Sequence, residues 1–306
     1  MECYYIVVSI KDLNFDHFIG QKVGTATLLK EHARGGMAVI FVAYQRSLKR
    51  QIAVKILPKS LLTPLAAELF QQEAEAAAVL SHPNIVPIYE VGDTEDFLFF
   101  TMQFVKGRPV SDHIEIARKH VLPSKHVLPL KVTIEIVTSV LDALDFAHRQ
   151  DIIHRDIKPA NILVETGTNR PLITDFGIVK LSRGPNVNSG MIVGTPIYMA
   201  PEVIRRSPVD GRADIYASGI MLFEMLVSDL PLPRFRTAQE ILETKLALKD
   251  RLFEAKPSQM NPMVDKKMDE IVFKAISYDP EKRYATCGEF LQCLRVYMNR
   301  YLREEP

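Results

Sequence analysis

The first third of the chain alternates short apolar runs with polar turns. The runs are rich in β-branched and aromatic residues, and Gly, Asp or Lys separates them, which predicts antiparallel strands joined by turns. The expected strands are 25–29, 38–44, 52–57, 85–91 and 97–105. Between them, 66–80 is rich in Ala, Glu and Gln and predicts one helix. His82-Pro83-Asn84 is expected to end it.

Beyond residue 110 the apolar positions recur three or four residues apart, as in Ile134, Val137, Leu141 and Leu144. This spacing predicts helices that bury one face. The expected helices are 131–149, 214–227, 266–277 and 287–301. Strands first and helices afterwards predict an α+β chain of two lobes, an antiparallel sheet with one helix and a mainly helical lobe. Two further apolar runs, 151–153 and 172–174, look strand-like and each leads into polar residues.

The composition is that of an ordinary soluble globular protein. The chain has 306 residues, 47% of them hydrophobic and 25% charged, with a net charge of +1. Interspersed charges of both signs argue against a nucleic-acid partner, which needs a concentrated basic face. The apolar N-terminus lacks the basic start and small-residue cleavage site of a signal peptide. The run 215–227 contains Glu224 and is too short to span a bilayer.

Three cysteines are present, Cys3, Cys287 and Cys293. They are too few for a disulfide framework and lack the spacing of a zinc site. A reducing, cytoplasmic location is therefore expected.

The candidate chemistry lies where the two strand-like runs of the second lobe end. Asp156 can accept or orient a hydroxyl proton, and Lys158 can neutralise a phosphate. Asn161 and Asp175 carry oxygens of the kind that Mg²⁺ prefers. In the first lobe, Lys55 lies inside an apolar strand; it is either a solvated edge residue or the buried partner of a carboxylate.

Glu73, on the expected helix of the first lobe, is the candidate partner of Lys55. Such a pair would hold an ammonium at the α- and β-phosphates of a nucleotide. Together these residues suit the transfer of a phosphoryl group, which needs neutralised phosphate charge, a held metal and a positioned hydroxyl.

At this point the sequence resembles a Hanks-type serine/threonine protein kinase of the kind common in bacteria. The motifs are 154–161 (His-Arg-Asp-Ile-Lys-Pro-Ala-Asn) and 175–177 (Asp-Phe-Gly), and the likeness runs from about 25 to about 294. By resemblance, Asp156 is the base, Asn161 and Asp175 hold Mg²⁺, and ATP is the phosphoryl donor. The lysine at 158 is typical of Ser/Thr rather than Tyr kinases.

The resemblance also assigns the nucleotide site, with Met102 at the gatekeeper position. The implied residues are Ala33, Gly35, Gly36, Ala38, Ile40, Ala53, Lys55, Met102, Gln103, Val105 and Leu163. The family's glycine-rich pattern G-x-G-x-x-G-x-V falls on Ala33, Gly35, Ala38 and Ile40, so two glycines are replaced. Added methyl groups narrow the allowed backbone angles, so weaker or slower ATP handling is expected.

The segment 194–202 (Gly-Thr-Pro-Ile-Tyr-Met-Ala-Pro-Glu) resembles the one that receives the peptide substrate. By resemblance, Glu202 pairs with Arg283 and Asp214 braces the catalytic loop. Arg155 is the residue that pairs with a phosphate on the activation segment. The hydroxyls there are Ser182, Ser189 and Thr195. Ser189 is the favoured phosphosite, whereas Thr195 is expected to contact Asp156.

These inferences predict an N-terminal extension (1–24), a kinase domain (25–295, with lobes 25–104 and 105–295) and a helical tail (296–306). The predicted function is that of a Mg²⁺-dependent signalling kinase that phosphorylates Ser and Thr residues of proteins. The kinase is also expected to phosphorylate itself, and a dimer is one arrangement in which it would do so. Two alternatives stay open. The altered glycine loop motivates a pseudokinase or nucleotide-binding scaffold, and a small-molecule kinase shares the same lobes.

Overall fold

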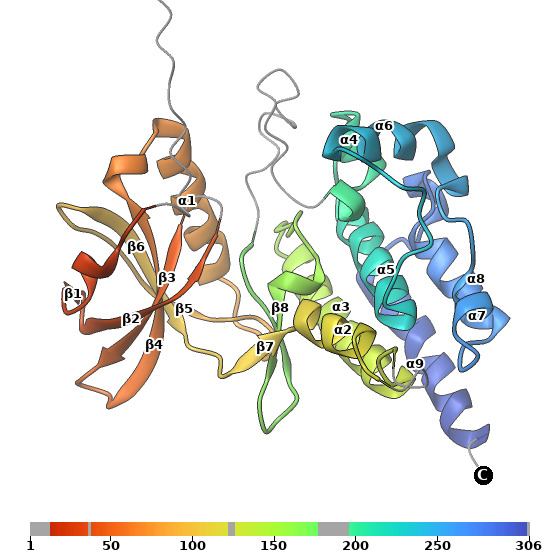
Figure 1. Ribbon diagram of the computed structural model, residues 1–306, viewed down its shortest axis with the longest axis horizontal. Helices are drawn as coiled ribbons and strands as arrows, with labels where there is room; N and C mark the ends of the chain where they lie inside the picture. Colours follow the sequence, from red (N-terminus) through yellow and green to blue (C-terminus); the bar gives the residue numbers. More distant parts are fainter. Residues whose placement is uncertain (1–12, 36–37, 122–125, 177–195, 305–306) are drawn as a thin grey trace, which may run out of the picture. The chain divides into compact units, whose positions relative to one another are not determined.

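A computed structural model describes most of the chain. The described residues are 13–35, 38–121, 126–176 and 196–304, with the backbone alone at Leu65 and 301–304. They divide into two compact units, one within Met1–Ser81 and Val86–Lys106, the other within His82–Ile85 and Gly107–Pro306. Each unit has its own colours along the chain in Figure 1.

The first unit is built on a six-stranded antiparallel sheet of order β1-β2-β3-β4-β6-β5. Its strands are β1 (Lys22–Val23), β2 (Ala26–Arg34), β3 (Val39–Gln45), β4 (Arg50–Pro58), β5 (Ile88–Asp93) and β6 (Phe97–Gln103). The helix α1 (Pro64–Ala78) packs against the sheet (Figure 1). Its start is set by Pro64 at the first position and by the Thr63 side chain, which accepts the Ala66 N–H at 3.1 Å.

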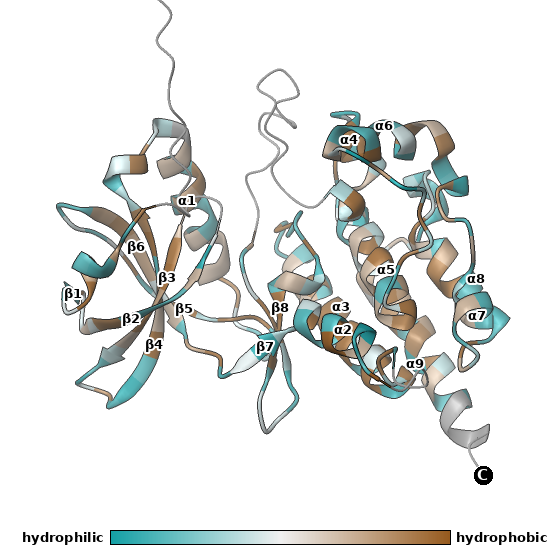
Figure 2. Cartoon of the chain, viewed as in Figure 1, coloured by the Kyte–Doolittle hydropathy of each residue, from teal (hydrophilic) through white to brown (hydrophobic). Residues whose placement is uncertain are grey.

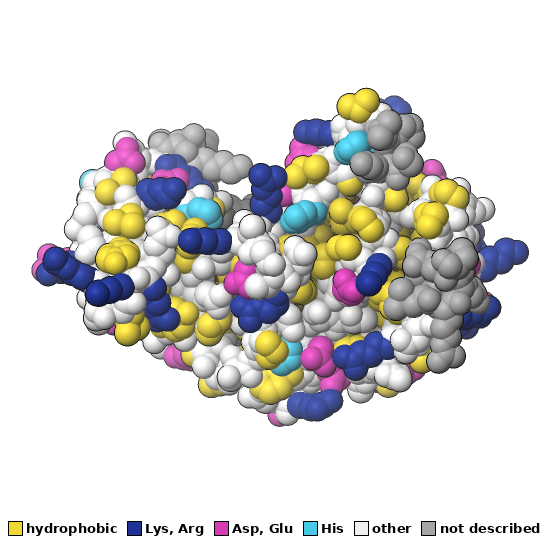
Figure 3. All heavy atoms as spheres, turned by 90° about the horizontal axis from the view of Figure 1, so that it is seen from below, with side chains coloured by type: hydrophobic (Ala, Val, Ile, Leu, Met, Phe, Trp, Pro, Cys, Tyr) yellow, Lys and Arg dark blue, Asp and Glu magenta, His cyan; other side chains and the backbone are white. Residues whose placement is uncertain are grey.

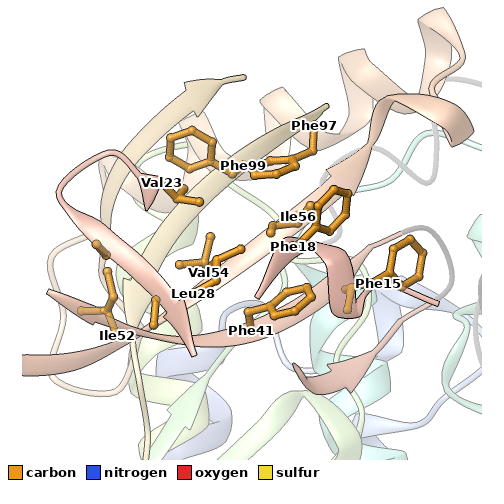
Figure 4. Packing of buried hydrophobic residues seen from close by; sticks show 13 residues of the cluster. Phe15, Phe18, Val23, Leu28, Phe41, Ile52, Val54, Ile56, Phe97 and Phe99 are labelled. Carbon is orange, nitrogen blue, oxygen red and sulfur yellow. The ribbon is translucent and has the colours of Figure 1, made fainter. Parts of the chain in front are cut away.

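A hydrophobic cluster of the first unit lies on one face of this sheet. Val54 and Ile56 are fully buried, and Phe18 reaches them from the segment before β1, with its ring centre 4.9 Å from that of Phe97 (Figure 4). Phe15 belongs to the same cluster. Burial of such aromatic side chains contributes about 2 kcal/mol each. The hydrophobic core therefore recruits residues that precede Thr25.

The second unit is mainly helical. Its helices are α2 (Val110–Arg118), α3 (Leu130–His148), α4 (Pro201–Ile204), α5 (Arg212–Val227), α6 (Ala238–Leu248), α7 (Pro257–Met260), α8 (Lys266–Ala275) and α9 (Cys287–Glu304). A small antiparallel sheet, β7 (Gly107–Pro109), β8 (Ile162–Glu165) and β9 (Pro171–Ile173), carries the loops of interest. Gly107 is required there, because a Cβ would lie 2.0 Å from the Val164 carbonyl oxygen.

The helix α5 forms the centre of the second unit. It is apolar around nearly its whole circumference (Figure 2), and α3, α8 and α9 pack on it. A helix that is apolar on all sides is stable only when other elements cover it. Asp214 is fully buried on this helix, so its carboxylate must find donors inside the protein.

The α+β architecture and the long helices and strands expected from the sequence are confirmed. One expectation was wrong, and two of the longer helices were missed. The run 151–153 forms no strand, since its residues enter a loop with Asp151 at a φ of +59°. The helices α2 and α6 were missed, because their charged residues hide the apolar spacing.

Among the described residues, no helix has the length and apolarity needed to cross a membrane. On the face shown in Figure 3, basic and acidic side chains of the described residues are interspersed, in keeping with the small net charge.

Candidate functional site

Lys55 and Glu73 meet inside the first unit. Lys55 Nζ donates to Glu73 Oε1 at 2.6 Å, from β4 to α1. The two side chains are only 13% and 18% exposed, and the Phe100 ring centre lies 5.5 Å from the ammonium. Val54 and Ile56 on either side are fully buried, so the strand is fixed and Lys55 is held in register. An ammonium aligned this way is suited to contact phosphate oxygens.

The β2–β3 hairpin carries the altered glycine pattern. Ala33 faces Ile40 across the hairpin, and the Gly35 N–H donates to the Ala38 carbonyl at 2.8 Å. Ala33 and Gly35 are exposed, whereas Ala38 is buried. Gly36 lies outside the described residues.

Adjacent strands carry the residues expected around adenine. Ala53 of β4 pairs with Met102 of β6, and both are buried. The Gln103 N–H donates to the Pro87 carbonyl at 3.1 Å, so the Gln103 carbonyl is the group it can offer a ligand. Val105 follows, also buried. In the second unit, Leu163 lies half-buried in β8 and pairs with Leu172.

A buried carboxylate shapes the loop before Asp156. Asp214 accepts the backbone N–H groups of His154 at 2.8 Å and Arg155 at 2.7 Å. Arg155 has a φ of +66°, a conformation that costs a non-glycine residue free energy unless the surroundings hold it. The expected bracing of this loop by Asp214 is confirmed.

Asp156, Lys158 and Asn161 form one cluster. Lys158 Nζ donates to Asp156 Oδ2 at 2.9 Å. Asn161 Nδ2 donates to the backbone carbonyl of Asp156 at 2.8 Å and to its Oδ2 at 3.0 Å. With its amide nitrogen engaged in this way, Asn161 keeps its Oδ1 as an oxygen ligand of the type that Mg²⁺ takes.

Asp175 is tied to this cluster through the backbone. The Thr174 N–H donates to the Asn161 carbonyl at 3.0 Å, and Asp175 follows with a φ of +57°. Phe176 is buried against His154, with ring centres 4.6 Å apart. The two loops that carry Asn161 and Asp175 are therefore held together, and these residue types fit a divalent cation.

His154 links the same two loops and is neutral. Burial lowers its pKa, which the nearby carboxylates only partly oppose. Its Nδ1 accepts the Asp156 N–H at 3.2 Å, and its Nε2 donates to the Thr174 carbonyl at 3.2 Å. The ring thus fixes the backbone at Asp156 without adding charge.

The expected pairing of Glu202 with Arg283 is confirmed. The guanidinium donates to both carboxylate oxygens, at 2.7 and 2.8 Å, and the two side chains are 5% and 0% exposed. Arg283 also donates to the Arg212 carbonyl at 2.9 Å. Thr195, Ser182 and Ser189 lie outside the described residues.

Two contributors were missed by the sequence reasoning. His148 Nε2 lies 2.8 Å from Asp214 Oδ2, and its Nδ1 lies 3.7 Å from the buried Cys287 Sγ. Gly211 makes room for this ring, because a Cβ there would lie 2.5 Å from Nδ1. The other contributor is Lys245, a buried lysine on α6. Neither belongs to a local motif that singles it out.

A sheet unit with a buried Lys–Glu pair, and a helical unit with the two loops described above, define a protein kinase domain. The protein kinase domain family matches residues 28–294, so this chain belongs to that family, as a Hanks-type member with bacterial relatives. Serine/threonine-protein kinase Pkn1 of Myxococcus xanthus is 33% identical over 94% of this chain and 40% of its own length.

The chain is also similar to other bacterial protein kinases. Tyrosine-protein kinase MasK of the same species is 33% identical over 92% of this chain and 44% of its own length. The solved PknI kinase domain of Mycobacterium tuberculosis is 25% identical with a TM-score of 0.70, covering 92% of this chain and 98% of that domain. The chain spans less than half the length of these two curated relatives.

Proposed function

We propose that this chain transfers the γ-phosphoryl group of ATP to Ser and Thr hydroxyls of proteins, in a Mg²⁺-dependent reaction. The observation that carries the proposal is the cluster of Asp156, Lys158 and Asn161, whose distances of 2.8 to 3.0 Å place a carboxylate, an ammonium and an amide together. Phosphoryl transfer depends on positioning and charge stabilisation rather than covalent chemistry. This cluster can supply both.

Each residue has a role that its contacts permit. Asp156 orients the attacking hydroxyl and accepts its proton, and Lys158 balances charge on the transferred phosphoryl group. Lys55, aligned by Glu73, holds the α- and β-phosphates. Asn161 and Asp175 would hold Mg²⁺, which supplies neutralisation of phosphate charge when bound.

Nucleotide binding is proposed for the residues that the family resemblance assigns: Ala33, Gly35, Gly36, Ala38, Ile40, Ala53, Lys55, Met102, Gln103, Val105 and Leu163. The methyl groups of Ala33 and Ala38 limit how closely backbone N–H groups approach phosphates. Slow or weak use of ATP is therefore part of the proposal.

Ser and Thr are proposed as acceptors because of Lys158, which lies at hydrogen-bond distance from Asp156. Because one relative is named a tyrosine-protein kinase, phosphoamino-acid analysis of the labelled product decides the acceptor. A signalling role in the cytoplasm, autophosphorylation, a dimer that supports it and a phosphosite at Ser189 are parts of the same proposal.

The test is transfer of labelled phosphate from ATP and Mg²⁺ to the chain itself and to a generic protein, followed by phosphoamino-acid analysis. Wild type should label Ser and Thr. Asp156→Asn should lower the transfer rate by about 10³-fold, because the hydroxyl loses its base, while ATP binding persists. Wild type that binds ATP without transfer would identify a scaffold, and labelling of metabolites alone a small-molecule kinase.

A further inference from the structure

Lys245 on α6 is a buried lysine, with 1% of its surface exposed. Its ammonium donates to three backbone carbonyl oxygens, those of Pro196 at 3.4 Å, Ile197 at 2.5 Å and Met199 at 2.7 Å. A lysine ammonium has three N–H donors, so its hydrogen-bonding capacity is fully used by one short stretch of backbone.

The environment of Lys245 is not that of an ordinary ion pair. Within the part of the chain that the structure describes, no carboxylate forms an ion pair with it. The face of Tyr216 on α5 lies 4.7 Å away and offers a favourable but weaker contact. Burying an ammonium is costly, and an apolar side chain of the same length would avoid that cost. The carbonyl contacts are therefore what the lysine contributes.

The stretch that Lys245 holds is a short turn with few bonds of its own. It consists of one 3₁₀ turn, Pro196–Tyr198, in which the Met199 N–H donates to the Pro196 carbonyl at 3.3 Å. The Tyr198 hydroxyl donates to Glu224 of α5. The turn is therefore held at two places. Glu224 of α5 binds the Tyr198 side chain of the turn, and Lys245 of α6 binds the backbone carbonyls of the turn. Without Lys245 the Ile197 and Met199 carbonyls would lose these partners.

We propose that Lys245 is a positioning residue for the protein substrate: it fixes the backbone of 196–199 in the form that presents the acceptor peptide. The proposal rests on the proposed function and on the resemblance of 194–202 to the segment that receives the peptide substrate in protein kinases. Lys245 touches neither the nucleotide residues nor Asp156 in any described contact. Its loss should therefore impair use of the protein substrate and spare nucleotide binding.

The experiment compares Lys245→Met, which keeps the length and removes every donor, with Lys267→Met. Lys267 is an exposed lysine paired with Glu270 on α8, so the same change there is the control. For Lys245→Met we expect the KM for a peptide substrate to rise by about tenfold or more, with the KM for ATP within about twofold of wild type. Lys267→Met should leave both unchanged.

An unchanged peptide KM in a folded Lys245→Met would overturn the proposal, as would a parallel loss of peptide use and ATP affinity, which marks a general loss of structure. A second measurement does not require activity. Hydrogen exchange of the backbone from 197 to 205 should be about tenfold faster in Lys245→Met than in wild type.

The two readouts separate the two proposals. If wild type transfers no phosphate, the proposed function fails, while the exchange result still decides whether Lys245 holds this backbone. Unchanged exchange overturns the inference about Lys245 even where wild type is an active kinase.

Discussion

At the scale of single residues, the candidate site depends on charged side chains that are mostly shielded from solvent. The Lys55–Glu73 pair is the clearest example, at 2.6 Å with both side chains mostly covered. Buried pairs add little net stability, because desolvation offsets their attraction. Their value lies in alignment: Glu73 fixes where the Lys55 ammonium points. Removal of the charge of Glu73 should therefore affect turnover more than folding.

We predict that Glu73→Gln lowers kcat by about 10- to 100-fold, because Lys55 is no longer aligned by an opposite charge. The free energy of unfolding should change by about 1 kcal/mol or less, since glutamine retains the shape and a hydrogen bond. Steady-state kinetics with denaturant unfolding measures both. Glu68→Gln, an exposed change on the same helix, is the control and should match wild type. Equal kcat for the two variants would contradict the alignment role.

The pKa of Lys245 is lowered well below its usual 10.5, chiefly by burial and also by the nearby Arg283, with Glu202 opposing. Tyr216 also faces it, with its own pKa raised by burial. In the pH range between the folded pKa and 10.5 the unfolded chain binds more protons at this site. The free energy of unfolding therefore gains a contribution that rises with pH.

We predict that the difference in free energy of unfolding, wild type minus Lys245→Met, becomes more positive as the pH rises toward 10.5. Other titrating groups are shared by both proteins and cancel in the difference. Chemical denaturation at several pH values measures this difference, and a constant difference would show that the pKa of Lys245 is not lowered in the folded protein.

At the scale of elements, the second unit positions its loops through the start of α5 and the end of α3. Asp214 in the first turn of α5 accepts the backbone N–H groups of His154 and Arg155, and His148 at the end of α3 contacts Asp214. Gly211, just before α5, leaves space for that histidine ring. The geometry of the loop therefore depends on how closely two helices approach.

We predict that Gly211→Ala destabilises the protein by about 1 to 3 kcal/mol, because the new Cβ overpacks against His148. The kcat should fall as well, since displacement of His148 disturbs Asp214 and the loop that it holds. Thermal unfolding and steady-state kinetics measure the two effects. Gly167→Ala is the comparison: nothing lies within 4 Å of its Cβ, but its φ is +92°. It should cost stability through backbone strain and leave kcat intact.

At the scale of the whole molecule, buried polar groups connect stretches that lie far apart in the sequence. The Glu202–Arg283 pair joins the start of α4 to the loop before α9. Both side chains are almost fully buried, so neither charge can be left alone without a large penalty. This pair therefore fixes the start of α4 against the segment that leads into α9.

We predict that Glu202→Ala lowers the free energy of unfolding by about 3 to 5 kcal/mol, because Arg283 remains buried without its partner. Denaturant unfolding measures the loss. Glu281→Ala removes the exposed partner of Arg212 and should cost about 0.5 kcal/mol, as exposed pairs do. If the two variants lost similar free energies of unfolding, burial of the Glu202–Arg283 pair would not make its loss more costly than that of an exposed pair.

Much of the site could be predicted because its residues lie in two short stretches. Asp156, Lys158 and Asn161 fall within six residues, so a motif in the sequence can single them out, although the loop conformation itself depends on Asp214. The long helices could also be predicted from the sequence, because α3 repeats its apolar positions over about five turns. The strand expected at 151–153 was wrong because local apolar content does not report on the partner strand that a sheet requires.

By itself, the sequence determined the class of protein and the α+β order of its elements, and it supplied the residues that we propose for phosphoryl transfer. All of these rest on local spacing. Only the tertiary structure showed the contacts of Lys245 and His148. Lys245 holds carbonyls nearly fifty residues earlier in the chain, and His148 holds a carboxylate 66 residues later. Such contacts depend on how helices pack, and no local pattern encodes a lysine's burial or the space that Gly211 leaves.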